Sequence, residues 1–106
     1  MMLNSPAVNA AFIAIWKLGA VIIPVTPMWN AREVRYVLED SGASFAITSP
    51  ELAARLKEAS SELPNFRKVL CIGESADTTN IEAEIEASTE FVPLVERETS
   101  DLAMLL

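Results

Sequence analysis

The sequence predicts an α/β fold, with a partial parallel sheet of about four short strands and covering helices. Short apolar runs alternate with stretches of helical periodicity, the connections between them are short, and residues typical of helix ends stand at the boundaries. We expect residues 1–106 to form a single incomplete α/β subdomain. Within it, 1–73 is a βα-repeat core, 74–100 an acidic variable excursion and 101–106 a terminal strand.

The first expected element is a helix that Ser5 can cap, with Pro6 in its first turn. Its apolar stripe consists of Val8, Ala11, Phe12, Ile15 and Leu18. Trp16 and other apolar residues make this helix apolar nearly all round, so we expect neighbours to cover it on more than one side. Gly19 is a natural end for it.

Ala20–Val25 is the first expected strand, because it is short, β-branched and apolar on both faces. Pro24 cannot donate to a sheet ladder, so we place it at the last position of the strand. Pro27 follows in the loop and keeps Thr26 extended.

The second helix is expected to start at Asn30, since Glu33 stands at the spacing of a capping box. Its inward residues are Val34, Val37 and Leu38. Gly42 ends it in the left-handed conformation.

Two more strands flank a third helix. Phe45–Thr48 and Lys68–Ile72 are the strands, and the helix between them begins at Ser49–Pro50 and is broken by Pro64–Asn65. Its inward residues are Leu52, Leu56 and Ala59, and its outward residues are Glu51, Arg55, Lys57 and Glu58. Further along, Ile81 and Ile85 indicate one short helix.

The charge balance excludes some partners. The net charge is −7 and histidine is absent. Basic residues supply most of the affinity for nucleic acids and for anionic membranes, so neither is an expected partner. Ala10–Val25 is the most hydrophobic segment, but it is shorter than the roughly 20 residues of a membrane span and contains a lysine, a glycine and a proline.

The single cysteine, Cys71, lies in an apolar run. We interpret it as a small buried hydrophobic residue and regard a reactive thiol as the less favoured alternative. One cysteine cannot form an internal disulfide, which fits a reducing compartment and a cytoplasmic location.

A series of short motifs marks the first half of the chain. They are Asn4-Ser5-Pro6, Ala14–Val21, Pro24–Met28, Arg32-Glu33, Tyr36–Ala43 and Ile47-Thr48. In order and spacing they closely resemble the N-terminal region of AMP-forming acyl-CoA synthetases, which belong to the adenylate-forming superfamily of AMP-dependent synthetases and ligases. That superfamily also includes luciferases and peptide-synthetase adenylation domains. The resemblance runs from Asn4 to about Pro50 and resumes over Asp101–Leu106.

The resemblance implies that the chain is an N-terminal fragment of an ATP-dependent ligase. Such an enzyme converts a carboxylate and ATP to an acyl-adenylate and then to a thioester of coenzyme A, so ATP, Mg and coenzyme A are implied for the full-length parent. In that family a loop rich in Ser, Thr and Gly holds the ATP phosphates and follows the last strand, which here ends at Leu106. No catalytic, cofactor-binding or metal-binding residue is therefore assigned to this chain. Its implied role is scaffolding, and it is expected to be inactive alone.

Several side chains nevertheless invite a functional interpretation. Phe12 and Trp16 can line an acyl tunnel, but on an apolar stripe we expect them in the core. Met28 and Trp29 follow a strand end and are better ligand candidates. Covering the sheet edge, or contacting the remainder of the parent ligase, is the favoured role for this pair.

Charged residues have simpler explanations as well. Arg32 and Arg35 can meet a phosphate. For Arg35, however, pairing with Glu39 on the helix surface is a sufficient explanation. The glutamates at 82, 84 and 86 can suggest a metal, but alternating acids on a solvated helix are the ordinary explanation.

The main alternative is a free-standing α/β protein-interaction module of flavodoxin-like or response-receiver type, without catalytic activity. The receiver form is disfavoured because strand ends carry Pro24, Thr48 and Gly73 instead of clustered acids. As an isolated chain we expect a homo-oligomer, formed by pairing of Asp101–Leu106 or by exchange of an element.

Overall fold

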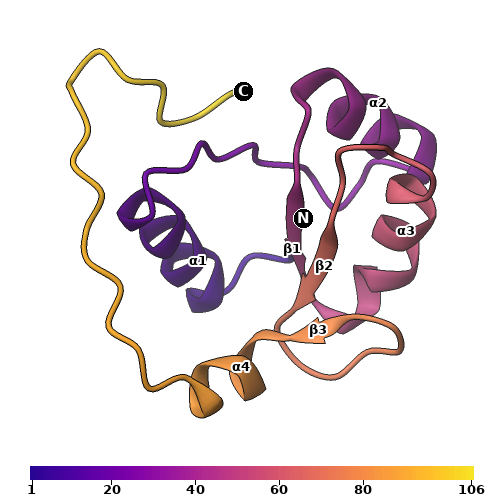
Figure 1. Cartoon of the computed structure of the whole chain (residues 1–106). Coiled ribbons are helices and arrows are strands. Elements are labelled where there is room, and N and C mark those ends of the chain that lie inside the picture. Colours follow the sequence, from indigo (N-terminus) through magenta and orange to yellow (C-terminus); the bar gives the residue numbers. More distant parts are fainter. The chain divides into compact units, whose positions relative to one another are not determined.

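The computed structural model describes residues 1–106 (Figure 1). Its elements in chain order are α1 (Pro6–Lys17), α2 (Ala31–Ser41), β1 (Phe45–Thr48), α3 (Pro50–Ser60), β2 (Lys68–Cys71), β3 (Thr79–Asn80) and α4 (Ile81–Ala87). The chain divides into two compact units. Unit 1 contains residues 1–3 and 25–88, and unit 2 contains residues 4–24 and 89–106. No helix is long and apolar enough to cross a bilayer.

Unit 1 is built on a parallel sheet with strand order β1-β2-β3. In its register Phe45 lies opposite Lys68 and Thr48 opposite Cys71, while Cys71 also lies opposite Asn80. The predicted α/β class and parallel sheet are therefore confirmed. The second of these strands ends at Cys71, one residue earlier than expected, and β3 was not predicted, because Thr79–Asn80 has no apolar run.

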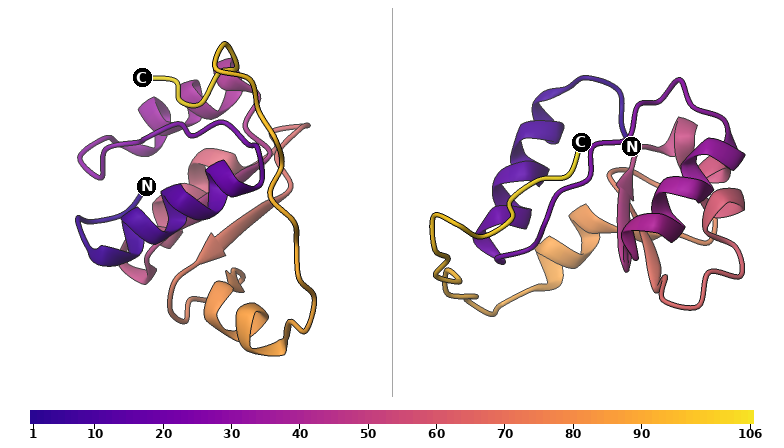
Figure 2. Two further views of the ribbon diagram at one scale, coloured as in Figure 1. Left: turned by 90° about the vertical axis from the view of Figure 1, so that its left-hand side faces the viewer. Right: turned by 90° about the horizontal axis from the view of Figure 1, so that it is seen from above.

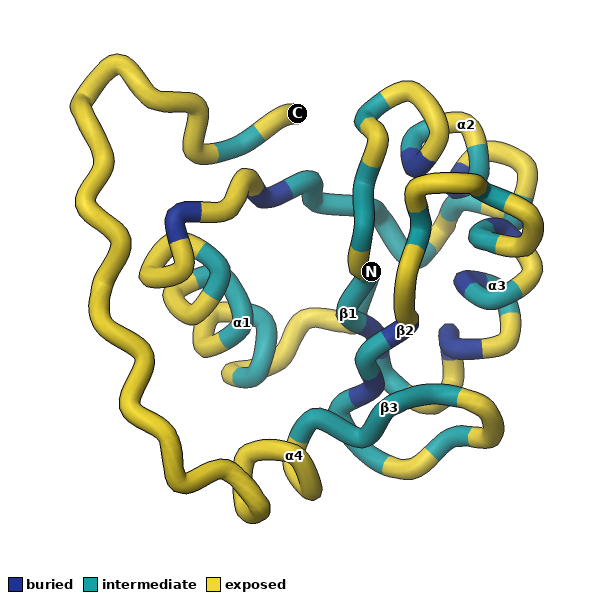
Figure 3. Tube along the Cα trace, viewed as in Figure 1, coloured by how far each residue is buried: buried dark blue, intermediate teal, exposed yellow.

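Helices α2 and α3 pack against each other, and α3 also packs on β1 and β2. Figure 2 shows the two helices on the same face of these strands. The core of unit 1 consists of Val34, Leu38, Leu56, Ala59 and Val69. The inward stripes predicted for both helices are thus confirmed, with Val37 half-buried beside them. Figure 3 shows this burial along α2, α3 and β2, whereas residues 82–103 are all exposed.

The helix ends agree with the sequence signals in position, but only one has the expected cap. Asn30 and Glu33 form the full capping box: the Asn30 side chain accepts from the Glu33 amide at 3.0 Å, and the Glu33 carboxylate accepts from the Asn30 amide at 2.8 Å. Gly42 follows in the left-handed conformation. Ser5 and Ser49 occupy N-cap positions without a side-chain cap. Ser49 Oγ instead donates to Glu51 at 2.7 Å, and this hydrogen bond lowers the pKa of the Glu51 carboxyl.

Unit 2 contains α1 and two extended segments. The bounds of α1 match the prediction, but none of its residues is buried, and Trp16 is 44% exposed. Of its predicted apolar stripe, Val8, Ala11, Phe12 and Ile15 are half-buried, whereas Leu18 is exposed. Gly19, with φ +67°, ends the helix, and an added Cβ would lie 2.7 Å from side-chain atoms of Val95 and Arg97.

The strands predicted at Ala20–Val25 and Asp101–Leu106 are corrected to a single parallel bridge between Ile22 and Met104. The amide of Ile22 donates to Ala103 O at 3.1 Å, and Leu105 donates to Ile22 O at 2.9 Å. The next bond of a parallel ladder would come from the amide two residues after Ile22. That residue is Pro24, which has no N–H, so the ladder stops after one bridge.

Two glycines of unit 1 allow a test of backbone strain. Gly42 has φ +65° and open space where an added Cβ would lie, whereas Gly73 has φ +104° and its Cβ would lie 2.9 Å from Pro50 Cγ. We expect Gly42→Ala to lower the free energy of unfolding by about 1 kcal/mol, the cost of a left-handed alanine. Gly73→Ala should lower the free energy of unfolding by about 2–3 kcal/mol, because the contact of the new Cβ with Pro50 adds to the backbone strain. Urea unfolding followed by circular dichroism measures both, and equal costs would contradict the contact.

Candidate functional site

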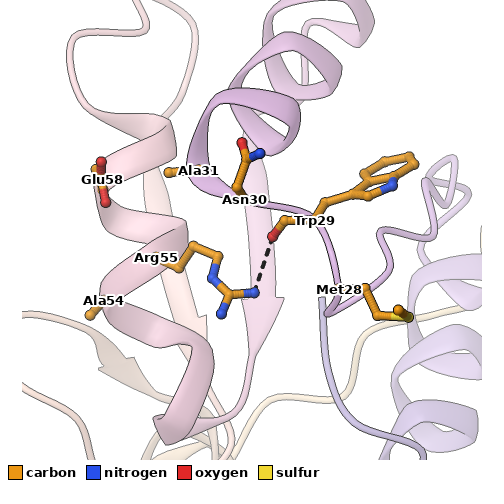
Figure 4. A pocket seen from close by; sticks show the side chains of 7 residues that line it. All are labelled: Met28, Trp29, Asn30, Ala31, Ala54, Arg55 and Glu58. Carbon is orange, nitrogen blue, oxygen red and sulfur yellow. Dashed lines mark hydrogen bonds between the residues drawn. The ribbon is translucent and has the colours of Figure 1, made fainter.

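The loop that carries Met28 and Trp29 leads into α2 and borders an open depression in unit 1. The depression is lined by Met28, Trp29, Asn30, Ala31, Ala54, Arg55 and Glu58 (Figure 4). Met28 is 89% exposed, while Trp29 is half-buried and packs against the core. Trp29 therefore anchors the loop through its side chain, and Met28 is the apolar group that the loop presents to solvent.

Arg55 connects α3 to this loop. Its Nη1 atom donates to Pro27 O at 2.6 Å and to Trp29 O at 3.0 Å. The side chain is half-buried, so its predicted outward position is wrong. Sequence reasoning missed this role because the acceptors are main-chain carbonyls distant in sequence; the only available signal was the place of Arg55 beside Leu56 on the flank of the inward stripe.

These bonds decide what the depression can do chemically. The donors of Arg55 that face the loop are already engaged by carbonyl oxygens, and Glu58 is the only other charged lining residue. Transfer of a phosphoryl or acyl group needs several donors that converge on developing negative charge. The depression does not bring such donors together.

The remaining arginines of the prediction lie elsewhere. Arg35 Nη1 donates to Ser61 O at 2.6 Å, so the predicted pairing with Glu39 is wrong. The carbonyl of Ser61 lies at the end of α3, where unpaired carbonyls attract cations. Arg32 is exposed on α2 and does not join the depression.

Cys71 is fully buried, as predicted for a hydrophobic residue in the sheet. Burial raises the pKa of its thiol, and a hydrogen bond with the Thr78 side chain opposes that shift in part. A thiol of raised pKa is a poor nucleophile.

Lys57 on α3 forms an ion pair with Asp77 at 2.8 Å, and this pair lowers the pKa of the Asp77 carboxyl.

In unit 2, Phe12 and Trp16 contact edge to face with ring centroids 6.0 Å apart. Phe12 is half-buried, but Trp16 is exposed and its Nε1 donates to Ala103 O at 3.1 Å. The predicted core position of Trp16 is thus wrong. The glutamates at 82, 84 and 86 are exposed on or at the end of α4, and the structure contains no group of acidic or cysteine side chains suited to hold a metal ion.

The sequence profile of the AMP-binding enzyme family matches residues 1–106. The chain belongs to this family. Curated relatives include tyrocidine synthase 3 of Brevibacillus parabrevis, which is 34% identical over 61 residues, covering 58% of this chain and 1% of that protein. A dimodular nonribosomal peptide synthase of Bacillus subtilis (strain 168) is 37% identical over 55 residues, covering 52% of this chain and 2% of that protein.

Solved structures of AMP-binding enzymes share the fold. The anthranilate CoA ligase AuaEII in complex with anthranoyl-AMP matches with a TM-score of 0.87 at 21% identity, over 98% of this chain and 20% of that one. A benzoate CoA ligase from Burkholderia xenovorans LB400 matches with a TM-score of 0.84 at 20% identity, over 99% and 21%. The chain thus spans about a fifth of the length of these ligases.

The role of Arg55 is testable through Trp29. We expect Arg55→Gln to lower the free energy of unfolding by about 1.5–3 kcal/mol, because it removes charged hydrogen bonds to two carbonyls. In a Trp16→Phe background, the emission of Trp29 should shift to longer wavelength as the loop loosens. Glu58 lines the same depression, but its side chain makes no hydrogen bond to the loop, so Glu58→Gln is the matched control. Unchanged emission and stability in Arg55→Gln would show that the loop does not depend on this residue.

Proposed function

We propose that this chain is a scaffold portion of an ATP-dependent acyl-CoA ligase. In that reaction a carboxylate oxygen attacks the α-phosphate of ATP, which releases pyrophosphate and leaves an acyl-adenylate. The thiol of coenzyme A then attacks the acyl carbon, and AMP leaves. The observation that carries the proposal is the match of residues 1–106 to AMP-binding enzymes, combined with a fold shared with aryl-CoA ligases.

The chemistry of the chain's own residues supports scaffolding. Its arginines at 35, 55 and 97 each donate to main-chain carbonyls, and Lys57 is paired with Asp77. Its three glycines are isolated, so no Gly-rich phosphate loop is present. We therefore propose that ATP, Mg and coenzyme A are held by residues outside this chain. Residues 1–106 would then be one incomplete subdomain of the parent, in a reducing, cytoplasmic compartment.

The nature of the acid has a second candidate. The relative from Bacillus subtilis is a peptide synthase by its name, at 37% identity, whereas the structural relatives act on aromatic acids by their names. If the activated carboxylate were that of an amino acid, the adenylate-forming step would be the same. The acid would differ, and so would the group that accepts the acyl chain in the second step. A panel of fatty, aromatic and amino acids distinguishes these candidates.

The test is pyrophosphate–ATP exchange, which measures reversible adenylate formation. We expect the 106-residue chain to give no exchange with any acid, and a polypeptide that also includes the gene's coding sequence beyond Leu106 to give exchange that depends on Mg and on one class of acid. Exchange by the short chain alone would refute the scaffold role. An absence of exchange by the longer polypeptide would refute the ligase proposal and favour the alternative of an α/β protein-interaction module.

We also propose that the isolated chain forms a homo-oligomer. Large apolar side chains are exposed in both units, including Phe45 at 52%, Phe91 at 91% and Leu102 at 57%. Light scattering at high concentration should therefore give a mass above 11.6 kDa. A monomer under these conditions would contradict this proposal.

A further inference from the structure

The C-terminal segment of unit 2 is held by side chains as well as by backbone. Ala103 O accepts two hydrogen bonds, from the indole Nε1 of Trp16 and from the amide of Ile22, both at 3.1 Å. The indole bond joins residues 87 positions apart in sequence. It fixes Ala103 beside the helix at the same carbonyl that sets the register of the Ile22–Met104 bridge.

A second side chain acts at the other end of the same segment. The guanidinium of Arg97 donates to Gly19 O, and its Nη1 lies 3.8 Å from the Asp101 carboxylate. The amide of Val95 donates to Lys17 O at 3.0 Å. Gly19 has no Cβ, which leaves the space that Arg97 and Val95 occupy.

The side-chain bonds of Trp16 and Arg97 are additional to the backbone bonds that form the bridge between Ile22 and Met104. An isolated parallel bridge has two backbone bonds and cannot grow past Pro24, so the backbone alone specifies register weakly. Trp16 supplies an additional bond at the bridge and Arg97 another near the helix end. Trp16 is 44% exposed, so burial of its ring does not account fully for a tryptophan at this position.

We infer that Trp16 and Arg97 are positioning residues that fix the register of Val95–Leu105 beside Gly19–Ile22. We name these two residues, with their acceptors Ala103 O and Gly19 O, the C-terminal anchor. Resting on the proposed function, the inference extends to the longer ligase, where the C-terminal anchor sets the position of residues that hold ATP.

The first experiment uses amide hydrogen exchange of the 106-residue chain by NMR. Trp16→Phe removes the indole donor and keeps an aromatic ring. We expect protection of the Ile22 and Leu105 amides to fall about 5-fold, as for the loss of one hydrogen bond, and more than about 20-fold in Trp16→Phe/Arg97→Gln. Protection of core amides such as Leu38 in unit 1 should not change, which excludes general unfolding.

The matched control is Ile13→Leu, an exposed apolar residue on the same helix that donates no side-chain hydrogen bond. It should leave protection at Ile22 and Leu105 unchanged. Equal protection in the wild type and the double variant would overturn the inference. So would exchange of both amides at unprotected rates in the wild type, because the segment would then not be held at all.

The second experiment uses pyrophosphate–ATP exchange by the longer polypeptide. Trp16→Phe should raise the KM for ATP about 5-fold or more with a smaller change in kcat, while Ile13→Leu matches the wild type. Exchange in the wild type with no effect of Trp16→Phe would overturn the extension to the ATP site. No exchange in the wild type would refute the proposed function, and the hydrogen-exchange result would still decide whether the C-terminal anchor sets register.

Discussion

The parallel pairing of β1 with β2 is the interaction on which unit 1 depends. Neighbouring parallel strands need a crossover, and here α3 provides it and also covers the strands that it joins. Because side chains alternate along a strand, the pairing places Thr48, Val69 and Cys71 in the interior. Leu56 and Ala59 of α3 belong to one core with Val34 of α2. This core therefore also positions the capping box of α2 and the loop before it.

Arginines of this chain stabilise irregular backbone. Arg35 bonds to the end of α3, Arg55 to the loop before α2, and Arg97 to the carbonyl of Gly19. A carbonyl left without a partner in a half-buried turn costs free energy, so each bond favours one loop conformation. Cations used in this way have fewer donors left for a phosphate, which agrees with the proposed scaffold role.

Much of the fold could be predicted because its signals are local. Asn30 with Glu33, and Gly42, marked the ends of α2, and periodicity gave the inward stripes of α2 and α3. Several misses depend on distant partners, whereas the missing cap at Ser49 has a local cause, its hydrogen bond to Glu51. Strand β3 exists through its register with Leu70 and Cys71, not through its own sequence. The acceptors of Arg35 and Arg55 lie 26 to 28 residues away, and the partner of Trp16 is further still. No spacing rule within one helix can find such contacts.

Pro24 has a consequence beyond ending a ladder. Sliding the C-terminal segment by two residues would keep every side chain on its face, and backbone geometry alone would permit it. In the observed alignment Pro24 cannot donate to the segment beside it, and after such a slip it still could not. The proline therefore keeps the pairing short without deciding which alignment forms. That choice falls to contacts outside the ladder, such as the bond from the Trp16 indole to Ala103 O.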